Sequence, residues 1–371
     1  MLEMFPGNYL WSYNTMLAFA GGGQIGDMEL IMPNLTANVG DNDVWHDEWT
    51  GLAAILEKRA RQCLSDRSYS ETMYLASLYE IIGEHFVPPA DPRRMLAYDR
   101  VLEMFEAARL KSPHRLEIVE VPFEGATLPA YFQPARDGNG PCGTVIMICG
   151  LDTTKELWYL RARQELSDRG LNVIFVDTPG IGGALRKQKL FTRADYEKPV
   201  RGIIDYLENR PEVDPSKIGI IGSSLGGYYV ARAAAYEQRI AATIAWGAIY
   251  DYHKVWVDRL ASKGTLGAPI FQIMFITGTN TVEDAVERIK DFRVEPLGPK
   301  ITCPFLIMHG AKDRQVPLED AGRMLDVIGS EDKELKIFNG QNGGSAHTQF
   351  NNHQPALHYG ADWMADKLRE L

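Results

Sequence analysis

Two hydrophobic patterns divide the chain. From Val44 to about Leu110, apolar residues recur at three- and four-residue steps, as they do on the buried face of an α-helix. Pro88, Pro89 and Pro92 interrupt this pattern because proline cannot continue a helix interior. No alternation typical of strands occurs there, so residues 1–114 are predicted to form an all-helical domain.

A second pattern begins after Pro113, where short β-branched runs are bounded by glycine and proline. The runs predicted as strands are Leu116–Pro122, Thr127–Gln133, Thr144–Cys149, Asn172–Asp177, Ile218–Gly222, Ala241–Trp246, Phe305–His309 and Leu335–Phe338. Helical stretches separate most of them, among them Glu156–Arg169, Ala194–Glu208, Leu225–Tyr236 and Leu318–Ile328. The first two runs flank Gly125 as an antiparallel hairpin would. Strands that are apolar throughout and alternate with helices predict an α/β domain over residues 115–371, with an eight-stranded, mostly parallel sheet covered on both faces.

Composition narrows the partners. With 39 basic against 49 acidic residues the formal charge is −10, so a nucleic acid or an anionic membrane would be repelled on average. No apolar run reaches the roughly 18 residues needed to span a bilayer, and the N-terminus has no basic segment of the kind that starts a secretion signal. We therefore expect a cytoplasmic protein that acts on a small molecule, without a nucleic-acid or membrane partner.

The cysteines indicate neither a disulfide framework nor a metal. Cys63, Cys142, Cys149 and Cys303 are far apart, without CxxC spacing or neighbouring histidine clusters. They are typical of reduced thiols in a cytosolic protein. No metal site and no cofactor are predicted.

The segment after the strand Ile218–Gly222 has the pattern of a nucleophile. Gly222-Ser-Ser224-Leu-Gly226 lies between that strand and a helix rich in small residues, the context of a strained turn that exposes a serine hydroxyl. Ser224 is the predicted nucleophile. The alternatives are a glycine-rich phosphate loop or a plain turn, and the Lys-Ser/Thr ending of a phosphate loop is missing.

A serine hydroxyl is a weak nucleophile at neutral pH, so it requires a base and an orienting acid. Asp313 lies in the loop after the strand Phe305–His309 and is the predicted acid; a solvated loop residue or a helix cap is the alternative. His347 follows a glycine-rich turn after the last strand and is the predicted base, with His353 as its rival.

Two backbone amides complete this chemistry. The residue after a serine nucleophile and the loop after the third strand supply the donors that stabilise an oxyanion. These positions are Leu225 and Leu151. Cys149 lies nearby, where a small packing residue is the simpler interpretation.

At this point the chain resembles the α/β-hydrolases of the FrsA-like group, which includes hydrolases of nicotine breakdown and of fungal pigment pathways. The resemblance is carried by CGLDTTKE (149–156), DTPGIGG (177–183), IGSSLGGYY (221–229), IAWG (244–247), HGAKDRQVP (309–317) and GGSAHTQ (343–349). It implies a triad of Ser224, Asp313 and His347, a helical cap domain before the hydrolase core, and a homodimer. A member of the group carries a substrate-proximal glutamate at the position of Asp152, which implies a substrate contact there; a helix N-cap is the alternative.

Four functions fit these residues. The first is hydrolysis of a carbon–carbon bond next to a ketone in an aromatic or polyketide-like compound, and the second is ester, thioester or amide hydrolysis with the same machinery. The others are acyl transfer or cyclisation, and a non-catalytic ligand receptor. Five aromatic residues are candidates to line an apolar pocket between cap and core, with core packing as the alternative for each: Tyr9, Trp11, Tyr228, Trp246 and Tyr250.

Overall fold

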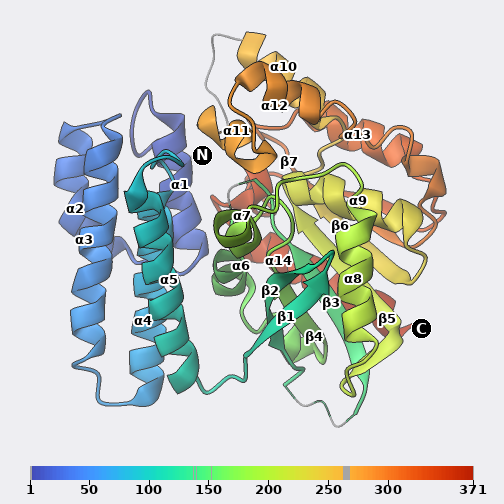
Figure 1. Cartoon of the computed structure of the whole chain (residues 1–371), viewed down its shortest axis with the longest axis horizontal. Helices are drawn as coiled ribbons and strands as arrows, with labels where there is room; N and C mark the ends of the chain where they lie inside the picture. Colours follow the sequence, from blue (N-terminus) through green and yellow to red (C-terminus); the bar gives the residue numbers. More distant parts are fainter. Residues whose placement is uncertain (1, 137, 139, 152, 262–267, 371) are drawn as a thin grey trace. The chain divides into compact units, whose positions relative to one another are not determined.

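The computed structural model describes every residue except 1, 137, 139, 152, 262–267 and 371. The chain divides into two compact units, Met1–Leu116 and Glu117–Leu371. Each unit has its own elements and its own buried core. In Figure 1 the first unit runs from blue to teal and the second from green to red.

The described part of the first unit is helical. Its helices are α1 (Tyr9–Ala20), α2 (Ile25–Ala37), α3 (Asn42–Ala60), α4 (Asp66–Glu84) and α5 (Pro92–Lys111). Asp41, Ser65 and Asp91 cap the last three through side-chain oxygens that accept backbone N–H groups of the first turn. The hydrophobic pattern does not locate α1, because this helix is buried on nearly all sides and presents no apolar stripe.

Indole rings occupy the core of this unit. Trp45 of α3 lies 4.8 Å from Trp11 of α1 between ring centroids, and its indole N–H donates to the carbonyl of Ile82 in α4. Gly83 permits α3 and α4 to approach closely, since a Cβ there would lie 2.9 Å from Thr50 Cγ2. The helices of this unit are therefore held together by the packing of large aromatic side chains between them.

The described residues of the second unit contain one eight-stranded sheet, in the order β1-β2-β4-β3-β5-β6-β7-β8. The strands are β1 (Glu117–Phe123), β2 (Ala126–Gln133), β3 (Cys142–Ile148), β4 (Asn172–Val176), β5 (Val213–Ser223), β6 (Ile240–Trp246), β7 (Phe305–Gly310) and β8 (Lys333–Phe338). The β1–β2 hairpin is antiparallel and pairs antiparallel with β4, whereas β3 to β8 are parallel. The predicted α/β fold is confirmed.

Helices cover both faces of this sheet, as Figure 1 shows for α8 (Glu197–Leu207) and α14 (Gln354–Arg369). Gly219 and Gly222 of β5 face opposite sides, because side-chain positions alternate along a strand. A Cβ at Gly219 would lie 2.4 Å from Met364 Sδ of α14, and one at Gly222 would lie 2.7 Å from Val230 of α9 (Leu225–Tyr236). The central strand is thus pressed between α14 and α9.

Some predicted boundaries are wrong. The helix predicted over Glu156–Arg169 ends early: α6 spans Lys155–Ala162, Arg163 has a positive φ of 29°, and a separate 3₁₀ turn covers Ser167–Arg169. β5 begins at Val213, five residues before the predicted start. The hydrophobic pattern misses this end of the strand because Asp214, Pro215 and Ser216 are not apolar and are less buried. The other helices are α7 (Gly182–Gln188), α10 (Tyr252–Ala261), α11 (Phe271–Thr277), α12 (Val282–Arg288) and α13 (Leu318–Val327).

The core of the sheet yields a stability prediction. Ile220 of β5 is fully buried, so Ile220→Ala should leave a cavity and lower the free energy of unfolding by about 2–5 kcal/mol. Ile118 of β1 is 53% exposed, and Ile118→Ala is the matched control with a far smaller loss. Urea unfolding followed by circular dichroism measures both, and equal losses would contradict this assignment of the core.

Candidate functional site

Ser224 occupies a strained turn between β5 and α9. Its backbone angles are φ 56° and ψ −121°, a region that non-glycine residues rarely adopt. The turn is tight: a Cβ at Gly222 would lie 2.1 Å from the carbonyl oxygen of Gly226. The amide of Ser224 donates to the carbonyl of Trp246, the last residue of β6, at 2.7 Å. The neighbouring strand thereby holds the turn in place.

Three side chains far apart in sequence form one chain of hydrogen bonds. His347 Nδ1 lies 2.6 Å from Asp313 Oδ2, and His347 Nε2 lies 2.8 Å from Ser224 Oγ. An ionised carboxylate only accepts, so the proton is assigned to Nδ1. Nε2 is then an acceptor for the hydroxyl of Ser224. This arrangement can remove a proton from the serine as its oxygen attacks a carbonyl carbon.

Asp313 is held as an acceptor. Its side chain is fully buried, and its second oxygen accepts the amides of Gln315 at 2.7 Å and Val316 at 3.0 Å. Burial by itself raises the pKa of Asp313, but the charge and hydrogen bond of His347 outweigh it and lower the pKa below the ordinary value of 3.8. The carboxylate therefore stays ionised next to the imidazole.

The turn that carries His347 is strained as well. Thr348 and Gln349 both have left-handed backbone conformations, with φ of 46° and 56°, at a cost of about 1–3 kcal/mol each. Gly247, itself at φ 84°, makes room for this turn, since a Cβ there would lie 3.0 Å from Thr348 Cγ2 and 3.2 Å from His347 Cε1. Gly247 and Gln349 end the segments IAWG and GGSAHTQ, which carry the resemblance, but neither residue is itself predicted to belong to the site.

The predicted oxyanion donors lie beside the serine. Gly150 packs directly on the turn, where a Cβ would lie 2.7 Å from Ser224 Cβ and 3.2 Å from the amide nitrogen of Leu225. This contact brings the loop that contains Leu151 next to Ser224. The described residues supply no acceptor for the amides of Leu151 and Leu225.

A buried ionic cluster supports that loop. Asp177, which follows β4, accepts the amide of Lys155 at 2.8 Å, the amide of Gly183 at 2.7 Å and the Lys155 ammonium at 3.1 Å. Glu156 accepts from the same ammonium at 2.5 Å and from the hydroxyl of Tyr131 at 2.9 Å. The sequence reasoning does not identify this cluster. The feature that could have indicated it is the DTPGIGG run, in which a carboxylate directly follows a buried strand and precedes paired glycines.

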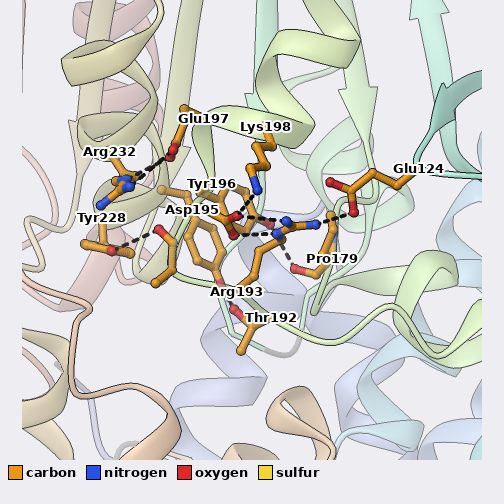
Figure 2. Close-up of polar contacts among 12 residues, drawn as sticks. Glu124, Pro179, Thr192, Arg193, Asp195, Tyr196, Glu197, Lys198, Tyr228 and Arg232 are labelled. Carbon is orange, nitrogen blue, oxygen red and sulfur yellow. Dashed lines mark hydrogen bonds and ion pairs between the residues drawn. The ribbon is translucent and has the colours of Figure 1, made fainter.

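Figure 2 shows how the segment between β4 and α8 is held. Arg193 donates to Asp195 at 2.6 Å and to Glu124, in the turn of the β1–β2 hairpin, at 2.7 Å. The hydrogen bond from Arg193 is the main cause that holds the pKa of Asp195 below its usual range. Glu197 accepts from Arg232 of α9 at 2.8 Å. The end of this segment and the first residue of α8 are thus bonded to the hairpin and to α9, the helix that follows Ser224.

The other histidines of the region are buried away from the serine hydroxyl. His353 is stacked on Trp246, with ring centroids 5.1 Å apart and planes at 2°. Burial, and then the charge of Arg161, hold the pKa of His353 well below 6.5. His309 lies on the far side of the acid, with Nε2 3.7 Å from Asp313 Oδ2, and burial lowers its pKa although Asp313 opposes this. The structure places His347, rather than His353, against Ser224.

The aromatic candidates are distributed over both units. Tyr9 and Trp11 belong to the first unit, where Tyr9 stacks on Tyr13 and the Trp11 indole donates to Asn42. In the second unit the Tyr228 hydroxyl donates to the carbonyls of Ala194 and Asp291, and Tyr250 is half-buried after β6. Trp246 is 1% exposed. Asp152 lies outside the described residues.

Among the residues of the described ranges, no group of three or more histidine, cysteine, aspartate or glutamate side chains is placed to hold a metal ion. No helix in the same ranges combines the length and hydropathy needed to cross a membrane.

The sheet order and the strained serine turn define an α/β-hydrolase. The esterase FrsA-like family matches residues 35–369, and the chain belongs to this family. It is a hydrolase of α/β fold, and the predicted resemblance is confirmed.

Relatives match over most of their length. The chain is 29% identical over 329 residues to 2,6-dihydropseudooxynicotine hydrolase of Paenarthrobacter nicotinovorans. The matched region covers 87% of this chain and 84% of that protein. It is 25% identical to hydrolase acrC of Aspergillus aculeatus, over 93% of both chains. A crystal structure of 2,6-dihydroxy-pseudo-oxynicotine hydrolase is similar with a TM-score of 0.81 at 26% identity, over 95% of both chains.

His353 yields a prediction for the pH dependence of stability. Its folded-state pKa is depressed, so below about pH 6.5 the unfolded chain takes up a proton that the folded chain does not. The stability present above pH 6.5 is then lost as the pH falls, by up to about 1.4 kcal/mol per pH unit. His353→Gln should flatten this decline, measured as the free energy of unfolding between about pH 7 and 5.

His358 provides the control for this measurement. It lies on the same helix, α14, with its side chain 52% exposed. His358→Gln should keep the wild-type slope even if it changes the absolute stability. An unchanged slope in His353→Gln would show that burial of His353 does not drive the decline.

Proposed function

We propose that this chain is a serine hydrolase that works through an acyl-enzyme on Ser224 and cleaves a carbon–carbon bond next to a ketone in aromatic or polyketide-like small molecules. The observation that carries the proposal is the unbroken hydrogen-bonded chain from Asp313 through His347 to Ser224. Its order along the sequence, serine then acid then histidine, is the order that α/β-hydrolases use.

The geometry supports a two-step reaction. Ser224 Oγ attacks the carbonyl carbon while His347 Nε2 takes the hydroxyl proton, and the oxyanion accepts hydrogen bonds from the amides of Leu225 and Leu151. When the tetrahedral intermediate collapses, the carbon–carbon bond breaks and its electron pair leaves as an enolate. His347 returns its proton to that leaving group. Water, deprotonated by His347, then attacks the acyl-serine, releases the carboxylic acid and restores Ser224.

Ester hydrolysis is the second candidate, and the description of the family as FrsA-like esterases favours it. Both reactions pass through a tetrahedral oxyanion and an acyl-serine, so the same residues serve either. They differ in the leaving group, which is an enolate carbon in one case and an alkoxide oxygen in the other. The similarity to a hydrolase named for 2,6-dihydropseudooxynicotine, over 87% of this chain, supports an aromatic substrate.

The helical region, residues 1–114, is proposed to act as the cap that selects the substrate. The family match begins at residue 35, inside this region, and continues to residue 369. The similarity to the solved hydrolase covers 95% of this chain. The helices are therefore shared with relatives that carry the same sheet, which supports a role in the common chemistry rather than an unrelated appendage.

The nucleophile is tested with a small activated ester, p-nitrophenyl acetate. Ser224→Ala removes the attacking oxygen and should lower kcat by at least about 1000-fold, with the thermal midpoint retained. Ser223→Ala, at the adjacent variable position of the turn, is the matched control and should keep most of the activity. Full turnover by Ser224→Ala would exclude an acyl-serine mechanism.

The type of bond is tested with paired substrates, an aryl 1,3-diketone and an aryl ester of the same carbon skeleton. Mass spectrometry should detect the carboxylic acid and the methyl ketone from the diketone, with a kcat/KM above that of the ester. Ser224→Ala should abolish both reactions and excludes spontaneous cleavage. Turnover of the ester alone would favour the esterase candidate over the carbon–carbon hydrolase.

A further inference from the structure

Trp246 is bonded to both of the segments that carry the reacting side chains. Its backbone carbonyl accepts the amide of Ser224 at 2.7 Å. Its indole N–H donates to Oε1 of Gln349, two residues after His347. Trp246 ends β6, the strand that pairs with β5 in a register that places Trp246 opposite Ser223. A single residue therefore connects the nucleophile turn with the histidine turn.

The histidine turn needs such a connection. Thr348 and Gln349 are both held in the left-handed region, so the turn can relax unless outside contacts fix it. The buried amide of Gln349 supplies these contacts: its backbone N–H donates to the carbonyl of Ala346 at 3.0 Å, its side-chain Nε2 points to the same carbonyl at 3.4 Å, and its oxygen accepts the indole of Trp246. In the sequence, His347 lies between Ala346, which Gln349 contacts, and Gln349 itself.

The indole ring is itself fixed by packing. His353 lies flat against it, with planes at 2°, and Trp158 packs at a centroid distance of 5.9 Å. The guanidinium of Arg161 lies 5.6 Å from the centroid of the Trp246 ring. Because Trp246 is 1% exposed and enclosed on these sides, its N–H points in one direction, toward Gln349.

We propose that Trp246 and Gln349 are a pair of positioning residues that set the distance between His347 Nε2 and Ser224 Oγ. This inference rests on the proposed function, in which that contact transfers the proton. In this proposal Trp246 does not contact the substrate but holds the turns that carry Ser224 and His347. A shift of about 1 Å in such a contact costs on the order of 100-fold in rate, so the pair acts on turnover and not on affinity.

The test is a double-mutant cycle with p-nitrophenyl acetate as substrate. Trp246→Phe keeps an aromatic ring against His353 but removes the indole N–H, and Gln349→Met keeps the side-chain length but removes the amide. Each should lower kcat by about 10- to 100-fold with KM within about twofold of the wild-type value. The double variant should be no worse than the poorer single variant, because the two substitutions break the same interaction.

A second readout separates positioning from substrate binding. Phenylmethanesulfonyl fluoride forms a sulfonyl ester with the oxygen of Ser224 and expels fluoride, with His347 taking the proton. Its second-order labelling rate should fall in parallel with kcat in both single variants. Trp256→Phe, a fully buried tryptophan in α10, is the matched control and should keep the wild-type labelling rate.

Three results would overturn the proposal. These are a kcat for Gln349→Met within about twofold of wild type, effects that multiply in the double variant, and an unchanged labelling rate when kcat falls. If Trp246→Phe does not fold, judged by its thermal midpoint, Gln349→Met decides through kcat and labelling. Ser224→Ala in the same assay tests the proposed function separately, because this variant lacks the attacking oxygen wherever the imidazole of His347 is held.

Discussion

The tight turn at Ser224 is the constraint on which the rest of the second unit depends. Its backbone can be kept at φ 56° only because three segments approach it without side chains. A Cβ at Gly222 would meet the carbonyl of Gly226 at 2.1 Å, one at Gly226 would meet the carbonyl of Cys149 at 2.6 Å, and one at Gly150 would meet Ser224 Cβ at 2.7 Å. The strand before the turn, the helix after it and the loop beyond β3 are therefore packed backbone to backbone. Such packing holds a hydroxyl in place without help from a substrate.

A buried ionic cluster around Lys155 holds the loop after β3 in place. Taking an ammonium and two carboxylates out of water costs several kcal/mol per ion, so the cluster around Lys155 adds little to stability by itself. Its effect is geometric, because Asp177 accepts backbone amides from the segment after β3 and from the segment after β4. Those two loops carry Leu151 and the DTPGIGG run, and the carboxylate fixes one relative to the other.

The pattern of the sequence predicts the fold well where a short apolar run is bounded by turn residues. β6 and β7 lie within one residue of their predicted bounds, because both strands are buried on both faces and so are almost continuously apolar. It fails where the environment is uniform or the chain is distorted. α1 is buried on nearly every side, and α6 stops at Ala162 because Arg163 adopts a backbone angle that no local pattern requires.

By itself the sequence determined the class of the fold, the serine turn and a short set of partners for it, because these depend on local spacing: glycines two residues on either side of Ser224 and polar residues directly after buried strands. It left His347 and His353 as rivals, six residues apart after the same strand. Only the tertiary structure separates them, since the left-handed pair Thr348–Gln349 turns His347 toward Ser224 and leaves His353 stacked on Trp246. Which residues support a site depends on distances between segments more than 100 positions apart, such as the 103 that separate Trp246 from Gln349, and no local pattern of residues encodes them.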